Sequence, residues 1–195
     1  MGKAVFTGLS HICIFVENVE KAIQYYKRIL GAVPKQYIPH FRNPGFFGAA
    51  GFLKEARDAD VSIGIMEVPG AGLVLELMCY HYPKGRQTPM FFRANDISGA
   101  RYIALKVANI EEAFEYIKSQ SDVTLINTSE EYRVFKISKV EPSQIKFFDP
   151  EKENNPYIKQ EAADILGNTK YFNFVDRYGL QWEYEQENVD ICDLG

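Results

Sequence analysis

An internal repeat limits the folds that this chain can adopt. The twenty residues at 8–27 recur at 99–118, which lie 91 positions further along. Eight of the twenty positions are identical: Gly8/Gly99, Ile12/Ile103, Val16/Val107, Asn18/Asn109, Glu20/Glu111, Ala22/Ala113, Tyr25/Tyr116 and Lys27/Lys118. A repeat of this length predicts two halves that fold in the same way.

Each copy predicts a strand followed by a helix. Apolar residues alternate along 12–16, which is the period of a strand. Asn18 then offers a side-chain oxygen to the free amides of a helix start, and Gly31 is suited to end that helix. In the second copy, Asn109 and Glu112 have the spacing of a capping box.

A shorter repeat closes each half. The segment 72–78 matches 179–185 in glycine, leucine and glutamate at an offset of 107. Because this offset exceeds the first by 16, the second half carries about that many additional residues, which we place near 150–168. Further strands are expected at 33–41, 61–66, 73–80, 123–126, 132–137, 144–148, 171–175 and 180–185, a short helix at 156–166, and an apolar loop at 41–52.

These elements predict an α+β fold of two tandem βαβββ modules. Helices in such modules cover one face of each sheet. The other faces can curl together, so we expect two curved sheets that form a shared cleft. The predicted organisation is a first module at 8–81, a connector at 82–98, a second module at 99–186 with the insertion, and a tail at 187–195.

Composition excludes several classes of function. The formal net charge is −4 with acidic and basic residues interspersed, which predicts no nucleic-acid partner and no membrane surface. No apolar run is long enough for a signal peptide or a membrane span. The chain has an odd number of cysteines, three, and none of them forms a C-x-x-C motif: Cys13, Cys79 and Cys192. A reduced, cytoplasmic setting is therefore expected.

We expect the functional side chains to lie on the strand faces that point away from the helices. If Ile12, Ile14 and Val16 face the helix, His11 and Cys13 lie on the opposite face. The two repeats place four residues at equivalent positions, namely His11, Glu76, Tyr102 and Glu183. Carboxylates within apolar strands are costly unless they are paired or bind a cation. Imidazole with carboxylates suits a divalent ion such as Fe, Mn, Ni or Zn.

The pattern resembles the vicinal oxygen chelate superfamily, which includes glyoxalase I, extradiol dioxygenases and the fosfomycin and bleomycin resistance proteins. The resemblance rests on Gly8-Leu9-Ser10-His11-Ile12, Tyr25-Tyr26-Lys27-Arg28-Ile29-Leu30-Gly31, Leu75-Glu76-Leu77-Met78 and Asp176-Arg177-Tyr178-Gly179 before Glu183. It implies His11, Glu76 and Glu183 as metal ligands. Tyr102 stands where a second histidine is common, which predicts a hydrogen-bond donor or pocket wall rather than a ligand.

Other residues have two interpretations. Phe46, Phe47 and Phe52 could line an apolar substrate pocket or cap the core of the first module. His40 borders this loop and could contact substrate. Cys13 shares the face of His11 and is expected to fill space beside the site.

The resemblance implies a metalloenzyme that acts on a small carbonyl or enolizable compound. Its reaction would be that of a lyase or isomerase, or of an Fe(II) dioxygenase, with Glu183 moving a proton and Tyr102 assisting. The alternative is a metal-free binding protein of the bleomycin-resistance type, which the aromatic residues favour. The sequence leaves open whether the site forms within one chain or across a homodimer.

Overall fold

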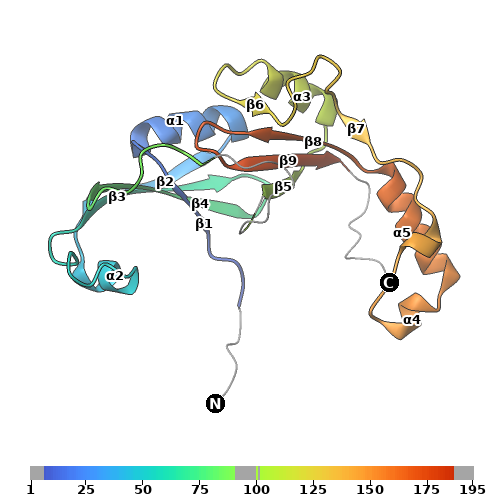
Figure 1. The fold of residues 1–195 in the computed structure, drawn as a ribbon, viewed down its shortest axis with the longest axis horizontal. Helices are drawn as coiled ribbons and strands as arrows, with labels where there is room; N and C mark the ends of the chain where they lie inside the picture. The colour runs from blue at the N-terminus through green and yellow to red at the C-terminus, as the bar shows by residue number, and fades with distance from the viewer. Residues whose placement is uncertain (1–6, 91–99, 101, 187–195) are drawn as a thin grey trace. The chain divides into compact units, whose positions relative to one another are not determined.

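The structure is a computed structural model that describes residues 7–90, 100 and 102–186. It divides into two compact units, residues 1–90 and 91–195. Gly99, Arg101, Cys192, residues 91–98 of the predicted connector and the predicted tail lie outside the described residues. Each unit contains one sheet with helices packed against it (Figure 1).

The first unit has a sheet in the strand order β1-β4-β3-β2. Its strands are β1 (Ile12–Phe15), β2 (Val33–Phe41), β3 (Asp60–Val68) and β4 (Leu73–Tyr82). β1 is parallel to β4, whereas the other neighbours are antiparallel. The first strand of the module therefore pairs with the last, which places distant segments of the chain side by side.

Helix α1 (Val19–Leu30) covers one face of this sheet and packs on β3 and β4. Both of its predicted ends are confirmed. The Asn18 side chain accepts a hydrogen bond from the Lys21 amide at 2.8 Å, and Gly31 ends the helix with a φ of 64°. A left-handed φ is one that glycine adopts at little cost.

Gly64 on β3 gives α1 its close approach to the sheet. A Cβ atom at this position would lie 2.7 Å from Cγ1 of Val19 and 3.3 Å from Cδ1 of Ile23. Val19 is branched and only 2% exposed, so it has little room to move. The helix therefore contacts the backbone of the strand directly.

We expect Gly64→Ala to lower the free energy of unfolding by about 1–3 kcal/mol, because overpacking shifts the helix or forces a rotamer change. Urea unfolding measures the change. Gly85→Ala is the matched control, since its added methyl would meet no atom within 4 Å. Equal stabilities of the two variants would contradict a tight contact between helix and sheet.

The second unit repeats this topology in the order β5-β9-β8-β6, with β7 also pairing with β8. Its strands are β5 (Tyr102–Lys106), β6 (Thr124–Leu125), β7 (Phe135–Lys136), β8 (Lys170–Val175) and β9 (Gln181–Gln186). Helix α3 (Ile110–Lys118) packs on β8 and β9. The predicted α+β fold of two βαβββ modules is confirmed.

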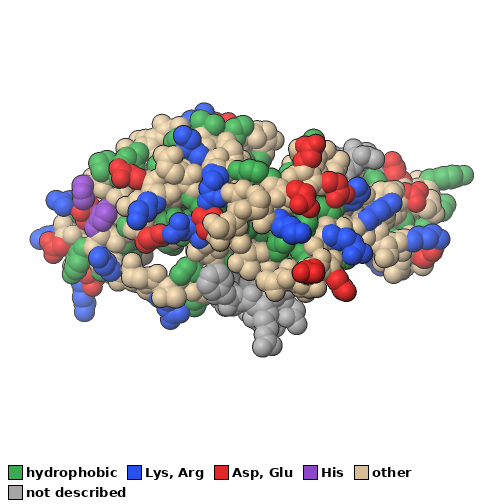
Figure 2. Space-filling view, turned by 90° about the horizontal axis from the view of Figure 1, so that it is seen from above, with side chains coloured by type: hydrophobic (Ala, Val, Ile, Leu, Met, Phe, Trp, Pro, Cys, Tyr) green, Lys and Arg blue, Asp and Glu red, His purple; other side chains and the backbone are tan. Residues whose placement is uncertain are grey.

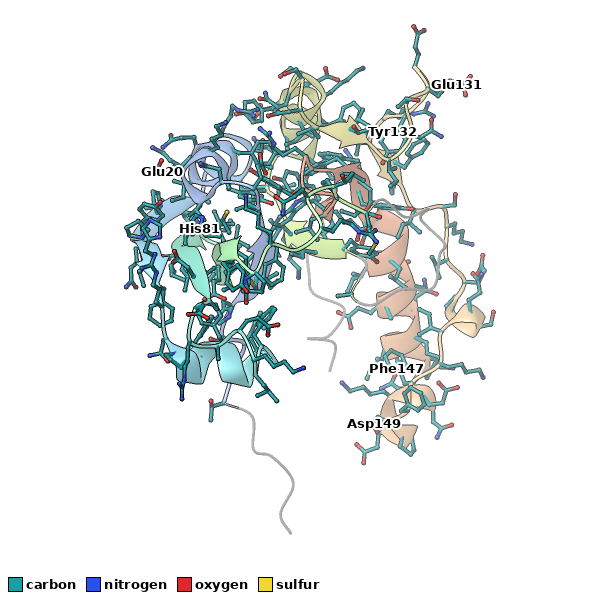
Figure 3. All side chains as sticks on the ribbon, turned by 60° about the vertical axis from the view of Figure 1, so that its left-hand side comes forward. Glu20, His81, Glu131, Tyr132, Phe147 and Asp149 are labelled. Carbon is teal, nitrogen blue, oxygen red and sulfur yellow. The ribbon has the colours of Figure 1, made fainter. Side chains whose placement is uncertain are left out.

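The insertion contributes the helices α4 (Pro150–Glu153) and α5 (Pro156–Asn168), preceded by the 3₁₀ helix η1 (Pro142–Gln144). Ala162 and Ala163 are the buried residues of α5, which packs against η1 and α4. The predicted helix at 156–166 is thus confirmed and extends two residues further. Figure 3 shows Phe147 and Asp149 beside these helices.

Three local predictions were wrong. Residues 144–148 form no strand, because Pro142 begins a 3₁₀ turn whose Glu141 and Gln144 satisfy each other's backbone amides. The Asn109 side chain makes no cap, since it donates to Glu112 Oε2 at 2.7 Å instead. The loop expected at 41–52 contains helix α2 (Pro44–Ala49), which the Asn43 side chain caps.

Candidate functional site

In the first unit, His11 and Glu76 come together on the sheet face opposite α1. β1 and β4 are adjacent, and Cys13 pairs in register with Glu76. Nε2 of His11 lies 3.2 Å from Oε2 of Glu76, with side-chain exposures of 40% and 16%. One nitrogen donor and one carboxylate oxygen therefore stand side by side and are reachable from solvent.

Ser10 completes the surroundings of His11. Its Oγ lies 3.0 Å from Nδ1 of His11, the ring nitrogen remote from Glu76. A hydroxyl can both donate and accept, so Ser10 satisfies Nδ1 in either tautomer. With Nδ1 protonated and donating to Ser10, the lone pair of Nε2 is available to a metal ion, which is the arrangement usual for metal-ligating histidines.

Cys13 and Tyr80 adjoin the Glu76 carboxylate. Burial raises the pKa of Cys13 to about 12, and the Glu76 charge and a hydrogen bond to it add to the effect. Burial likewise raises the pKa of Tyr80, followed by the influence of Cys13 and Glu76. Both groups therefore stay protonated at neutral pH, so they are walls and hydrogen-bond donors of the site rather than anionic ligands.

In the second unit, Glu183 ends a chain of hydrogen-bonded side chains. Nε2 of Gln181 donates to Oδ1 of Asn173 at 2.9 Å, and Nδ2 of Asn173 donates to Oε2 of Glu183 at 3.0 Å. The Tyr132 hydroxyl accepts from the Asn173 backbone amide at 2.7 Å. Gln181 and Asn173 are buried, so the carboxylate is oriented by a fixed amide.

Tyr102 is a neutral phenol beside this carboxylate. The charge of Glu183 raises the pKa of Tyr102, and burial and Glu185 raise it further. Tyr102 pairs in register with Gln181 at the start of β5. A phenol that resists ionisation is a poor metal ligand but keeps its O–H at neutral pH, which supports its interpretation as a hydrogen-bond donor.

The two units carry equivalent donor positions. Cys13 pairs with Glu76 in the first unit, and Ala104, its counterpart in the repeat, pairs with Glu183 in the second. Among the described residues, no three His, Cys, Asp or Glu side chains are grouped so that they could hold a metal ion. The first unit thus brings together one nitrogen and one oxygen donor, His11 and Glu76, and the second unit carries the carboxylate of Glu183 at the equivalent strand position.

The aromatic loop caps the core of the first unit. Phe47 is fully buried in a cluster with Val61, Ile63 and Met78. Phe46 and Phe52 are partly buried and pack against it, as do Cys13 and Tyr80. This placement supports core packing for Phe47, whereas the partly exposed Phe46 and Phe52 keep the substrate-binding interpretation.

His40 lies on the opposite side of the sheet from Glu76. Together with His81, it borders a pocket next to Asn18 and Val19 at the start of α1. His40 Nδ1 lies 2.9 Å from Oδ2 of Asp60, which also accepts from Arg42 at 3.0 Å. The structure therefore does not bring His40 together with His11.

Asp60 is held ionised in this cluster. Burial alone would raise the pKa of Asp60, but the hydrogen bonds and charges of Arg42 and His40 outweigh it and hold the pKa below its usual value. A lowered pKa in the folded state means that this interaction contributes stability above the unfolded pKa. That stability is lost as the pH falls through the folded pKa.

We expect Asp60→Asn to lower the free energy of unfolding by about 1–2 kcal/mol at pH 7, a modest loss because Arg42 and His40 are both well exposed. The difference from the parent protein should persist down to about pH 5 and shrink below about pH 4. Urea unfolding across this range measures it. Asp58→Asn, at an exposed neighbouring position, is the control; a pH-independent difference would contradict the prediction.

Two residues that contact the candidate site residues were not predicted from the sequence, namely Ser10 and Asn173. Ser10 precedes the predicted histidine directly, so its role was readable from adjacency once His11 was chosen. Asn173 pairs with Glu183 across β8 and β9. That pairing follows from the hairpin register, which the sequence pattern did not determine.

The chain matches a known protein family over most of its length. A family model described as the Glyoxalase/Bleomycin resistance protein/Dioxygenase superfamily matches residues 8–184. The chain therefore belongs to this superfamily, as its repeat and strand motifs indicated. No curated protein matches the chain significantly.

Solved structures are similar to the chain at low sequence identity, and the first of them shares its fold. A glyoxalase family protein from Bacillus cereus is 14% identical with a TM-score of 0.59, and the alignment covers 97% of this chain and 99% of that one. The fosfomycin resistance protein FosX from Listeria monocytogenes, solved with Mn(II) and sulfate, is 14% identical with a TM-score of 0.46, covering 95% and 96%. Among the described residues, no helix is both long and apolar enough to span a membrane.

Proposed function

We propose that this protein is a glyoxalase-like metalloenzyme that acts on a small carbonyl or enolizable compound. His11 and Glu76 would supply two ligands to a divalent ion, either Fe, Mn, Ni or Zn. Glu183 would supply the third, from the same chain or from a second copy in a homodimer. The observation that carries the proposal is the 3.2 Å approach of His11 Nε2 to Glu76 Oε2.

The separation of these two atoms is close to that of two ligands on one ion. Two ligands of one tetrahedral ion at about 2.0–2.2 Å bring their donor atoms to roughly 3.3–3.6 Å from each other. The Ser10 hydroxyl already satisfies the second ring nitrogen of His11. The sheet face around Glu76 is apolar, with Met78 buried beside it and Cys13 partly buried.

The residues of the second unit suit proton transfer. When bound, a divalent ion would stabilise negative charge on a substrate oxygen as a Lewis acid. The Asn173 amide holds one oxygen of Glu183, and the other oxygen, once released from the metal, would accept a proton from carbon. Tyr102 stays protonated and can donate a hydrogen bond to a developing oxyanion. These roles favour a lyase or isomerase reaction. If the bound ion is Fe(II), the reaction would instead be that of a dioxygenase.

Tyr102 also favours a second candidate, a metal-free binding protein of the bleomycin-resistance type. A neutral phenol occupies the repeat position equivalent to His11, so the ligand set is smaller by one histidine than in the expected pattern. Such a protein would use its aromatic residues to enclose a small molecule. Retention of both His11 and Glu76 in contact argues against it.

Metal analysis of the purified protein tests the proposal. We expect about one divalent ion per chain to bind at the His11–Glu76 pair at micromolar concentration after chelator treatment, and His11→Ala to abolish the binding of that ion. A protein that neither copurifies with metal nor binds it at that concentration would refute the metalloenzyme. The binding protein would then be preferred if His11→Ala also left ligand binding intact.

A further inference from the structure

The α1 side of the first sheet carries two histidines in contact. The rings of His40 on β2 and His81 on β4 have centroids 5.0 Å apart and planes inclined by 39°. Figure 2 shows histidine side chains next to each other on the surface, and Figure 3 shows His81 on this sheet. Both residues are exposed, and they border a pocket of about 330 Å³.

Irregular strand pairing brings these rings together. The register of β2 against β3 shifts between Ile38 and Phe41, which is where His40 lies. The register of β3 against β4 shifts between Asp60 and Val61, opposite His81. Bulges re-aim side chains and are frequent beside functional sites. Two shifts at one place in the sheet therefore turn both imidazoles into the same pocket.

Each imidazole has one nitrogen fixed by a protein partner. Asp60 Oδ2 can only accept, so Nδ1 of His40 carries the proton of their 2.9 Å hydrogen bond. The Ser62 hydroxyl donates to the Pro39 carbonyl at 2.8 Å, so it accepts from Nε2 of His81 at 2.5 Å. Neutral rings in these tautomers present lone pairs on Nε2 of His40 and Nδ1 of His81.

We propose that His40 and His81 bind a borderline divalent transition-metal ion such as Zn²⁺ through these two nitrogens. A carboxylate and a hydroxyl that fix the remote nitrogens are the outer partners typical of metal-ligating histidines. Water or a small ligand in the pocket completes the coordination. The site is separate from the proposed site at His11, because it lies on the other face of the sheet.

The ring separation agrees with such an ion. With a metal–nitrogen distance of about 2.0–2.1 Å and roughly 1.1 Å from nitrogen to ring centre, a tetrahedral angle places the centroids about 5 Å apart. The observed separation is 5.0 Å. Cys79 also lines the pocket, where its Sγ donates to the Glu17 carbonyl.

Binding would tie the edge of the sheet to its centre. β2 is an edge strand that is mostly exposed, and β3 separates it from β4. An ion held by His40 and His81 bridges β2 and β4 across β3. Ligands that bind only the folded state raise its stability in proportion to the logarithm of their concentration. Zn²⁺ should therefore raise the melting temperature.

Calorimetric titration of Zn²⁺ into the chelator-treated protein tests the site, with Mg²⁺ as the hard-ion control. We expect His40→Gln and His81→Gln each to weaken one equivalent of Zn²⁺ binding by roughly tenfold or more and to remove the melting-temperature rise linked to it. His11→Gln should leave this equivalent unchanged. Both pocket histidines are exposed, so their variants should fold.

The outcomes separate this site from the proposed enzyme. If His11→Gln removes all Zn²⁺ binding, or if the His40 and His81 variants bind Zn²⁺ like the parent protein, the two-histidine site is refuted. If the pocket variants lose one equivalent and His11→Gln loses none, the site stands even though the proposed metalloenzyme fails. Equal binding of Mg²⁺ at this site would also overturn the proposal, because imidazole discriminates against hard ions.

Discussion

Replacing Glu76 by glutamine is expected to weaken divalent-metal binding at the His11 site by roughly a hundredfold or more, since even partners outside the ligand shell contribute 10–100-fold. The substitution keeps the shape of the side chain but removes the negative charge that a divalent ion requires. The amide oxygen can still accept from His11. We therefore expect the metal-free variant to unfold at nearly the parent temperature.

Calorimetry with Mn²⁺ or Zn²⁺ measures the affinity, and the melting temperature without metal reports the fold. Because Zn²⁺ has a second proposed site, the titration should be carried out in the His81→Gln background. Glu67→Gln is the matched control, since Glu67 is on the neighbouring strand β3 and forms a half-exposed pair with Lys35. An exposed pair of this kind contributes about 0–1 kcal/mol. Equal affinities of the two variants would remove Glu76 from the site.

The repeat predicted the parts of the structure that depend on local periodicity. Alternation along β1 and β4 placed His11 and Glu76 on one face, and the two offsets assigned Glu183 its equivalent position in β9. The Asn18 cap and the Gly31 stop were predictable because each acts on its own neighbours in sequence. These features need no knowledge of how distant segments pack.

Features that depend on strand register were not predictable. The clustering of His40, Asp60 and His81 requires two register shifts, and a strict two-residue period gives no sign of either. Asn173 reaches Glu183 because the β8–β9 hairpin pairs these residues directly. The sequence did hold one unused signal: Asn43 followed by Pro44 is typical of a helix start, and α2 begins there.

The helix-capping error at Asn109 has a simple physical origin. Asn109 and Glu112 have the residue types of a capping box, but their side chains bond each other at 2.7 Å instead of the backbone. Gln186 from β9 accepts from the Ile110 amide at 3.2 Å in their place. A residue 76 positions away therefore helps to cap α3, so the start of this helix depends on the closing strand of the same unit.

Asp176→Ala is expected to lower the free energy of unfolding of the second unit by about 3–5 kcal/mol, because each buried donor left without its acceptor costs about 1–3 kcal/mol. Asp176 is 2% exposed. Its Oδ1 accepts from the Tyr178 and Leu180 amides at 2.9 and 3.0 Å, and its Oδ2 accepts from the Trp182 indole at 3.0 Å. Alanine would leave three donors inside the β8–β9 turn without this acceptor. The turn leads into β9, which carries Glu183, so its loss would also affect the position of that carboxylate.

Trp182 is the single tryptophan of the chain and is fully buried, so its fluorescence follows unfolding of this unit in urea. Asp149→Ala is the control, because Asp149 caps the short helix α4 at the surface and its loss should cost about 0.5–2 kcal/mol. If Asp176→Ala costs no more than the control, the turn is held by its backbone bonds alone, namely Asp176 to Leu180 at 2.9 Å and Gly179 to Asp176 at 3.0 Å. The position of Glu183 would then not depend on the Asp176 carboxylate.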